Sequence, residues 1–374
     1  MRSTPAFLPA LLAVIAACSP KSGDRSETGR IDTSAAATDT AATARAPDGP
    51  AKPTDQMQRV LTQLAALKPK PIVELSAVEA RKQPSPADAV KALLKKEGKS
   101  TAPEPVPSVV NRTIPGPGGA IPVRIYTPEG QGPFPVVLYI HGGGWVIANL
   151  DTYDASPRAL ANLAKAVVVS THYRQAPEHK FPAAHQDAFA AYKWTLANAK
   201  SLKGDPKRVG IAGESAGGNL AAAVSMMARD GGVQLPGHQV LVYPIAGYDL
   251  NTPSYQEHAD AKPLNKPMMG WFFEQYLKSP ADGKNPLIDL VHADLKGLPP
   301  TTIINAQIDP LRSDGEMLAD ALKQAGVDAE QKTYDSVTHE FFGMGAVVDE
   351  AKEAQQMAAD ALKDGFGGEV TAAR

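Results

Sequence analysis

The sequence predicts an α/β fold, with a mostly parallel central sheet flanked by helices. After residue 100, apolar runs that fit buried strands alternate with helix-like segments, which is the βαβ rhythm of such a sheet. Two glycine-rich pentapeptides, His141–Trp145 and Gly213–Gly217, each follow one of these apolar runs. The chain has 374 residues, and the part after its unusual N-terminal region is long enough for one large domain.

The pentapeptide Gly213–Gly217 has the form Gly-x-Ser-x-Gly. Residues 208–212 before it fit a strand, and residues 219–228 after it fit an apolar helix. A strand that turns sharply into a helix holds the serine strained and exposed, and the flanking glycines leave room for the turn. The pattern alone is short, so this strand–turn–helix context is what predicts Ser215 as a nucleophile.

The pentapeptide His141–Trp145 contains three consecutive glycines and follows the strand candidate 134–140. Glycines leave backbone N–H groups bare, so these groups can approach a substrate carbonyl. Two N–H groups of this run, with that of Ala216, are predicted to bind the negative oxygen of a tetrahedral intermediate. His141 comes at the strand end before these donors, and we interpret it as a loop-shaping residue, not as a catalytic base.

A serine nucleophile needs a base and an acid that orients the base. The acid is predicted to be Asp309, which follows the buried-strand pattern at 301–306. Because Pro310 cannot continue a strand ladder, Asp309 lies at the carboxyl edge of the sheet, where sites gather in open α/β sheets. Asp314 is the alternative acid, but it falls in the first turn of the next helix and is interpreted as a cap.

The base is predicted to be His339. In this fold class the triad runs serine, acid, histidine along the chain, and His339 follows the strand candidate 330–334, one strand beyond the acid. The three other histidines after the nucleophile are interpreted as surface residues: His238, His258 and His292.

With these motifs in this order, the chain resembles the hormone-sensitive-lipase-like branch of the α/β-hydrolases, the bacterial family IV esterases, over roughly residues 56–365. The resemblance implies a triad of Ser215, Asp309 and His339. It also implies an oxyanion hole made by the N–H groups of three residues: Gly142, Gly143 and Ala216. The segments that carry the likeness are 141–144, 173–179, 181–184, 213–219, 309–312 and 339–341.

Two residues depart from the family pattern. Glu340 stands where the family usually has glycine, and Gln307 replaces a more usual acidic or small residue. Neither change removes a catalytic group. Because Glu340 alters the charge at the mouth of the site, it bears on substrate preference more than on activity.

The resemblance also implies a helical cap over the site. The helix-like segments 55–67 and 87–94 are separated by a proline-rich break, and with the rest of about 55–100 they are expected to form its first part. A later insertion at about 248–276 is expected to complete it. Its aromatic cluster is either cap core or pocket wall, and the two alternatives stay open: Trp271, Phe272 and Phe273.

The N-terminal sequence predicts that the protein is exported. Residues 1–17 carry a short apolar core and are interpreted as a signal peptide that ends at a bacterial lipobox before Cys18. Cys18 is the only cysteine of the chain and is the predicted lipidation site. Residues 18–54 contain too few apolar residues to form a packed core, so they are expected to form a flexible tether. The hydrolase domain then spans 55–365, with a tail at 366–374. By resemblance to other bacterial lipoproteins, in which an aspartate after the cysteine is the usual inner-membrane retention signal, Ser19 implies the outer membrane. A periplasmic or secreted protein is the alternative.

Composition argues against several function classes. The chain carries 38 Lys and Arg against 40 Asp and Glu, with no basic stripe for a nucleic acid. No residues have metal-ligand spacing, so neither a metal nor another cofactor is expected. The prediction is a serine carboxylic-ester hydrolase that acts on small-molecule, short-chain acyl esters. A deacetylase or lactonase with the same machinery is the alternative, and a binding lipoprotein without activity is a further one; the oligomeric state stays open.

Overall fold

The computed structural model describes residues 51–367. The predicted signal peptide, Cys18 and most of the predicted tether lie outside the described residues. Thr54, placed at the end of that tether, is already part of the fold: its side-chain oxygen accepts from the N–H of Met57, and its own N–H donates to the carbonyl of Ser336. At the other end, Phe366 is buried against the domain.

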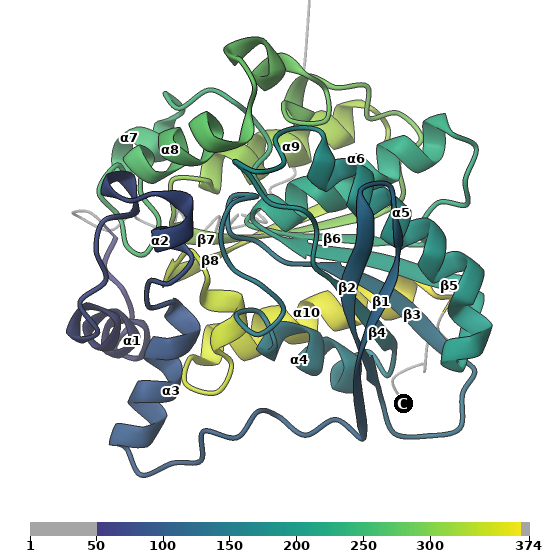
Figure 1. The fold of residues 1–374 in the computed structure, drawn as a ribbon, viewed down its shortest axis with the longest axis horizontal. Helices are drawn as coiled ribbons and strands as arrows, with labels where there is room; N and C mark the ends of the chain where they lie inside the picture. Colours follow the sequence, from purple (N-terminus) through teal and green to yellow (C-terminus); the bar gives the residue numbers. More distant parts are fainter. Residues whose placement is uncertain (1–50, 368–374) are drawn as a thin grey trace, which may run out of the picture. The chain divides into compact units, whose positions relative to one another are not determined.

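The central sheet has eight strands in the order β1-β2-β4-β3-β5-β6-β7-β8 (Figure 1). The strands β1 and β2 form a hairpin, and β2 pairs antiparallel with β4. All other neighbours are parallel. This mostly parallel sheet confirms the predicted fold class. The bounds are β1 Ser108–Gly116, β2 Gly119–Thr127, β3 Phe134–Ile140, β4 Val167–Thr171, β5 Gly204–Glu214, β6 Gln239–Val242, β7 Thr301–Ile308 and β8 Ala329–Thr338.

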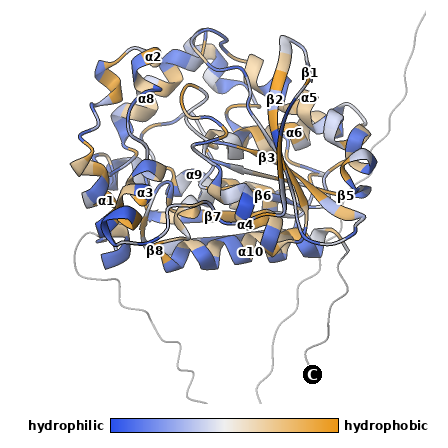
Figure 2. Ribbon diagram, turned by 60° about the horizontal axis from the view of Figure 1, so that its bottom comes forward, coloured by the Kyte–Doolittle hydropathy of each residue, from blue (hydrophilic) through white to orange (hydrophobic). Residues whose placement is uncertain are grey.

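Helices cover both faces of the sheet, because side chains alternate between the two faces along each buried strand. In β3, Val136, Leu138 and Ile140 pack into the layer of α5, α6 and α9, whereas Val137 and Tyr139 pack into the layer of α4 and α10. Figure 2 shows α10 and α4 on the same side of the sheet. The bounds are α4 Ala155–Leu163, α5 Ala183–Asn198, α6 Ala216–Asp230, α9 Arg312–Gln324 and α10 Asp349–Gly365.

The predicted cap helices are present as separate short helices. The first group, α1 to α3, begins at side-chain caps: Thr54 accepts from Met57, and Ser76 and Ser85 each form a capping box. The second group, α7 and α8, lies within the expected insertion. The bounds are α1 Asp55–Ala66, α2 Ala77–Ala80, α3 Pro86–Lys96, α7 Pro253–Glu257 and α8 Lys266–Tyr276, with a 3₁₀ turn η1 at Ile72–Glu74.

Candidate functional site

Ser215 lies at the sharp turn between β5 and α6. Its backbone has φ 56° and ψ −119°, a conformation that costs a non-glycine residue roughly 1–3 kcal/mol. The turn is possible because its flanks are glycines: a Cβ on Gly213 would lie 2.1 Å from the carbonyl oxygen of Gly217, and one on Gly217 would lie 2.0 Å from that of Ile140. The strained, glycine-flanked turn expected from the sequence is therefore present.

Asp309 and His339 follow neighbouring parallel strands, so both lie at the carboxyl edge of the sheet beside Ser215. The Nδ1 atom of His339 is 2.6 Å from Oδ2 of Asp309, and its Nε2 atom is 3.1 Å from Oγ of Ser215. Both residues are buried, and Oδ1 of Asp309 accepts the N–H of Leu311. The three residues predicted from the sequence thus form one continuous hydrogen-bonded chain.

The environment of His339 favours its charged form. Burial alone would lower the pKa of His339, but the attraction of Asp309, together with Glu340 and Glu214, raises this pKa above its ordinary value. A base with a raised pKa takes a proton from a serine hydroxyl more readily. The arrangement can therefore activate Ser215 and hold the resulting imidazolium.

Of the three predicted oxyanion donors, Gly143 lines the same cavity as the nucleophile, whereas Gly142 is its neighbour along the chain and Ala216 is the neighbour of Ser215. Gly143 and Gly144 line the cavity together with Ser215, and Ala216 is the first residue of α6. Gly143 has φ 93°, and a Cβ there would lie 2.2 Å from the carbonyl oxygen of Ile147. Within residues 51–367, the N–H groups of Gly142, Gly143 and Ala216 have no hydrogen-bond acceptor. Of these three N–H groups, that of Gly143 belongs to a residue that lines the cavity, so it is available to a substrate oxygen there.

Asp314 does not cap a helix, which corrects the expectation from the sequence. The N-cap position of α9 is Leu311, and Oδ2 of Asp314 instead accepts the N–H groups of Ala246 and Gly247, at 3.0 and 3.1 Å. Burial raises the pKa of Asp314 to about 8. Asp314 thus fixes the loop after β6 and makes no hydrogen bond with His339.

Two of the three histidines interpreted as surface residues are buried, so that interpretation is wrong for them. The Nε2 atom of His238 lies 2.9 Å from Oγ1 of Thr302, and burial lowers the pKa of His238 to about 4. His258 is buried against Arg312. Both histidines are covered by elements that are distant in the sequence, so their burial could not be predicted from the residues around them. His292 is exposed, as expected.

His141 is buried at the end of β3 and fixes the loop that follows. Its Nε2 atom lies 2.9 Å from Nδ1 of His172, and its ring stacks on Tyr173 at 4.6 Å. Burial lowers the pKa of His141 to about 3, so the ring is neutral. This agrees with the loop-shaping role expected from the sequence.

A buried carboxylate beside the nucleophile was missed by the sequence analysis. Glu214 accepts hydrogen bonds from the hydroxyls of Tyr139 and Tyr243, and burial raises its pKa to about 7. The ring of Tyr243 also packs on His339, with 4.4 Å between centroids. Glu214 is the variable residue of the Gly-x-Ser-x-Gly motif, and nothing local in the sequence pairs it with two tyrosines from different strands and loops.

The two departures from the family pattern differ in their position. Gln307 accepts the N–H of Ser336 with its side-chain oxygen, so it braces the end of β8 and does not line the cavity. Glu340 does line the cavity, and Oε1 of Glu340 lies 3.9 Å from Nε2 of His339. Its carboxylate also accepts a hydrogen bond from the hydroxyl of Tyr153.

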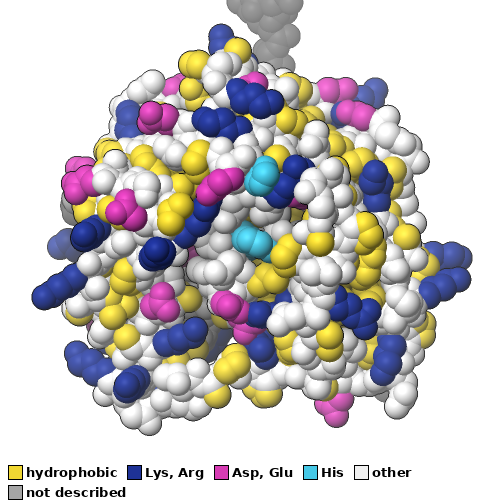
Figure 3. All heavy atoms as spheres, in the orientation of Figure 1, with side chains coloured by type: hydrophobic (Ala, Val, Ile, Leu, Met, Phe, Trp, Pro, Cys, Tyr) yellow, Lys and Arg dark blue, Asp and Glu magenta, His cyan; other side chains and the backbone are white. Residues whose placement is uncertain are grey.

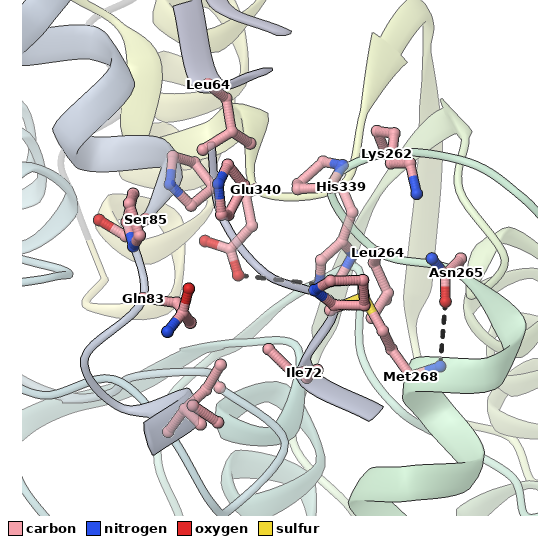
Figure 4. A pocket seen from close by; sticks show the side chains of 18 of the residues that line it. Leu64, Ile72, Gln83, Ser85, Lys262, Leu264, Asn265, Met268, His339 and Glu340 are labelled. Atoms are coloured by element: carbon pink, nitrogen blue, oxygen red, sulfur yellow. Dashed lines mark hydrogen bonds and ion pairs between the residues drawn. The ribbon is translucent and has the colours of Figure 1, made fainter. Parts of the chain in front are cut away.

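A cavity of about 920 Å³ opens above the nucleophile, between the sheet edge and the cap. Both cap segments contribute walls, as Figure 4 shows for Ile72, Gln83 and Leu264 around His339. Of the aromatic cluster, Phe272 lines the cavity, whereas Trp271 and Phe273 are buried elsewhere in the core. Both alternatives for this cluster therefore hold, for different residues.

Three further features of the described residues concern charge distribution, metal-binding groups and membrane spans. Figure 3 shows cationic and anionic side chains interspersed over one face. Within residues 51–367, no group of three or more histidine, cysteine or carboxylate side chains could hold a metal ion. No helix in this range has the length and apolar character needed to cross a bilayer.

Comparison with known proteins decides the family. The sequence profile of the α/β hydrolase fold matches residues 137–343. The chain belongs to the α/β hydrolases. Within them, this α/β hydrolase belongs to the hormone-sensitive-lipase-like branch, as its motifs indicated.

This α/β hydrolase is similar to several named enzymes. It is 42% identical to carboxylesterase NlhH of Mycobacterium tuberculosis, over 65% of this chain and 78% of that protein. It is 33% identical to the ethyl acetate hydrolase of Pseudomonas putida, over 78% of this chain and 92% of that protein. Among solved structures, it resembles a hyperthermophilic esterase of Pyrobaculum calidifontis, with 38% identity, a TM-score of 0.77 and coverage of 84% of this chain and 98% of that one.

Proposed function

We propose that this α/β hydrolase is a carboxylic-ester hydrolase whose catalytic triad is Ser215, His339 and Asp309. The observation that carries the proposal is the unbroken hydrogen-bonded chain from Asp309 through His339 to Ser215 at the floor of an open cavity. The names of the similar proteins, carboxylesterase and ethyl acetate hydrolase among them, support the ester bond as the target.

In the proposed mechanism, Oγ of Ser215 attacks the acyl carbon while Nε2 of His339 takes its proton. Asp309 holds the imidazole by its Nδ1–H and stabilises the imidazolium. The N–H groups of Gly142, Gly143 and Ala216 bind the oxyanion, and each donor is worth about 3–4 kcal/mol of barrier. His339 then protonates the leaving alcohol, and an acyl-enzyme forms. Water, activated by His339 in turn, releases the acid.

Short acyl chains are the proposed substrates. Cap residues such as Phe272 and Ile72 line the cavity, and we expect such walls to limit the length of the acyl chain. A deacetylase or lactonase would use the same groups, and their substrates share the ester or acyl carbonyl. A binding protein without activity would have no use for an aligned triad, so the geometry favours an enzyme.

The test is labelling with a fluorophosphonate probe, which reacts with an activated serine. Wild-type protein should be labelled, and Ser215→Ala should not. A screen of p-nitrophenyl, N-acetyl and lactone substrates then separates esterase from deacetylase and lactonase. An unlabelled, folded wild-type protein would contradict the proposed function.

We also propose that the enzyme is a lipoprotein of the bacterial outer membrane, anchored through Cys18. The support is the sequence alone: the apolar segment and lipobox before Cys18, and Ser19 after it. Several acyl chains on one residue give firm anchoring, because one chain alone binds a membrane only marginally.

A further inference from the structure

Glu340 carries three costs for the stability of the fold. Its backbone lies in the left-handed region, with φ 71°, where glycine is favoured. Its carboxylate is largely buried, and both this burial and the nearby charge of Asp309 raise the pKa of Glu340. Within residues 51–367, no lysine or arginine forms an ion pair with it. Residues with several destabilising features are often found at functional sites, so Glu340 is expected to have a function in the cavity.

The position of Glu340 points to the alcohol half of the substrate. Oε1 of Glu340 lies 3.9 Å from Nε2 of His339, the atom that protonates the leaving oxygen. A proton is transferred over roughly 3 Å between heavy atoms. The leaving oxygen therefore comes within about 7 Å of the Glu340 carboxylate, and the first two or three atoms beyond that oxygen can come closer still. Figure 4 shows Glu340 and His339 side by side in the cavity.

The carboxylate is held in place and keeps acceptor capacity. Tyr153 donates one hydrogen bond to Oε1, while a carboxylate has about four acceptor sites on its two oxygens. The side chain is 21% exposed, so part of it faces the open cavity. A negative group that is largely buried in the wall of a cavity attracts a positive charge or a hydrogen-bond donor more strongly than it would in bulk water.

We propose that Glu340 is a specificity-determining residue that selects esters of amino alcohols and polyols, in which a cation or hydroxyl stands about two carbons from the ester oxygen. This inference rests on the proposed ester hydrolysis and deepens it. Esters with an anionic group at the same position should be rejected by like-charge repulsion.

Lysines at the cavity rim do not provide the same discrimination. Lys68, Lys70 and Lys262 line the cavity but are exposed to solvent. Water and salt screen exposed charges, whereas a charge within the cavity is screened much less. Glu340, next to the reacting atoms, is therefore the group that senses the alcohol.

The test compares two pairs of butyrate esters of matched shape. Butyrylcholine is compared with 3,3-dimethylbutyl butyrate, and 2-hydroxyethyl butyrate with propyl butyrate. For the charged pair, kcat/KM for butyrylcholine divided by kcat/KM for 3,3-dimethylbutyl butyrate should fall about tenfold in Glu340→Gln. This substitution keeps the shape of the side chain and one acceptor oxygen. For the hydroxyl pair, kcat/KM for 2-hydroxyethyl butyrate divided by kcat/KM for propyl butyrate should fall less. Glu74→Gln is the matched control, because Glu74 is an exposed carboxylate on η1 outside the cavity lining.

A charged-pair ratio that changes less than twofold in Glu340→Gln, or equally in Glu74→Gln, would overturn the proposal. A second measurement needs no variant: wild-type enzyme should hydrolyse the butyrate ester of glycolate more slowly than propyl butyrate, although glycolate is the better leaving group. Faster hydrolysis of the glycolate ester would also overturn it. If wild-type enzyme hydrolyses none of these esters, the proposed function itself fails, which is a distinguishable result.

Discussion

The Nδ1 atom of His339 lies 2.6 Å from Oδ2 of Asp309, and both groups are buried at the ends of neighbouring parallel strands. The short contact supports the proposal that Asp309 is the acid that orients the base. Asp309→Asn should therefore lower kcat by at least about a thousandfold, as should Ser215→Ala and His339→Ala, because the three groups act as a unit. Steady-state kinetics on p-nitrophenyl butyrate measures this, and the double variants should lose little more than the singles.

Asp314→Asn is the control for the acid. Asp314 accepts two backbone N–H groups of the loop after β6 and makes no hydrogen bond with His339. The variant should keep most of the activity. An inactive Asp314→Asn beside an active Asp309→Asn would show that the acid is wrongly assigned.

Short acyl chains should be preferred. Each added methylene gains only about 0.8 kcal/mol of burial until the chain reaches the cap wall, and a clash then reverses the gain. We expect kcat/KM to be highest at about eight carbons or fewer in a series of p-nitrophenyl esters from acetate to palmitate. Faster hydrolysis of emulsified triolein than of butyrate esters would mean that the enzyme is a true lipase.

The acid limb of the pH profile should depend on Glu340. His339 must be neutral to act as a base, and activity is lost as the pH falls through its pKa. Because the charge of Glu340 contributes to raising the pKa of His339, Glu340→Gln should lower that pKa and move the acid limb of kcat/KM to lower pH. The profile is measured with propyl butyrate in a pH-stat, with Glu74→Gln as control. An unmoved limb, or one that moves upward, contradicts this prediction.

Glu214 should make stability depend on pH. Its folded-state pKa of about 7 lies above the unfolded value of about 4.3, so its contribution to stability is present in acid and is lost as the pH rises from about 4 to 7. Glu214→Gln has no such loss. The free energy of unfolding of the variant relative to wild type should rise by roughly 2–4 kcal/mol between pH 4 and pH 8. Urea unfolding at several pH values measures it, and a difference independent of pH would contradict the prediction.

Cys18→Ala should abolish lipidation without changing the catalytic domain, since Cys18 precedes the domain by more than thirty residues. In fractionated cells, wild-type esterase activity should sediment with the outer membrane, while activity of the variant should not. Mass spectrometry of the N-terminal peptide gives the direct readout. Soluble wild-type activity with no acyl mass on that peptide would indicate an ordinary exported enzyme.

The sequence alone was sufficient to predict the fold class and to select the three residues that we propose as the triad. Strand, turn and helix propensities are local, and the positions of Ser215, Asp309 and His339 follow from them, because parallel strands bring their carboxyl ends to one edge. The need for glycines around Ser215 is also a local property, because a side chain at either position would clash with the backbone of the sharp turn.

Only the tertiary structure decided what surrounds these groups. Asp314 reaches a loop far along the chain, His238 and His258 are covered by other elements, and Glu214 is enclosed by Tyr139 and Tyr243. The sequence marked Glu340 as unusual, but its distance from His339 and its partner Tyr153, far away in the chain, come from packing. Burial and charge coupling depend on distances between segments that no local pattern encodes, and these distances determine the direction in which the pKa values of the site shift.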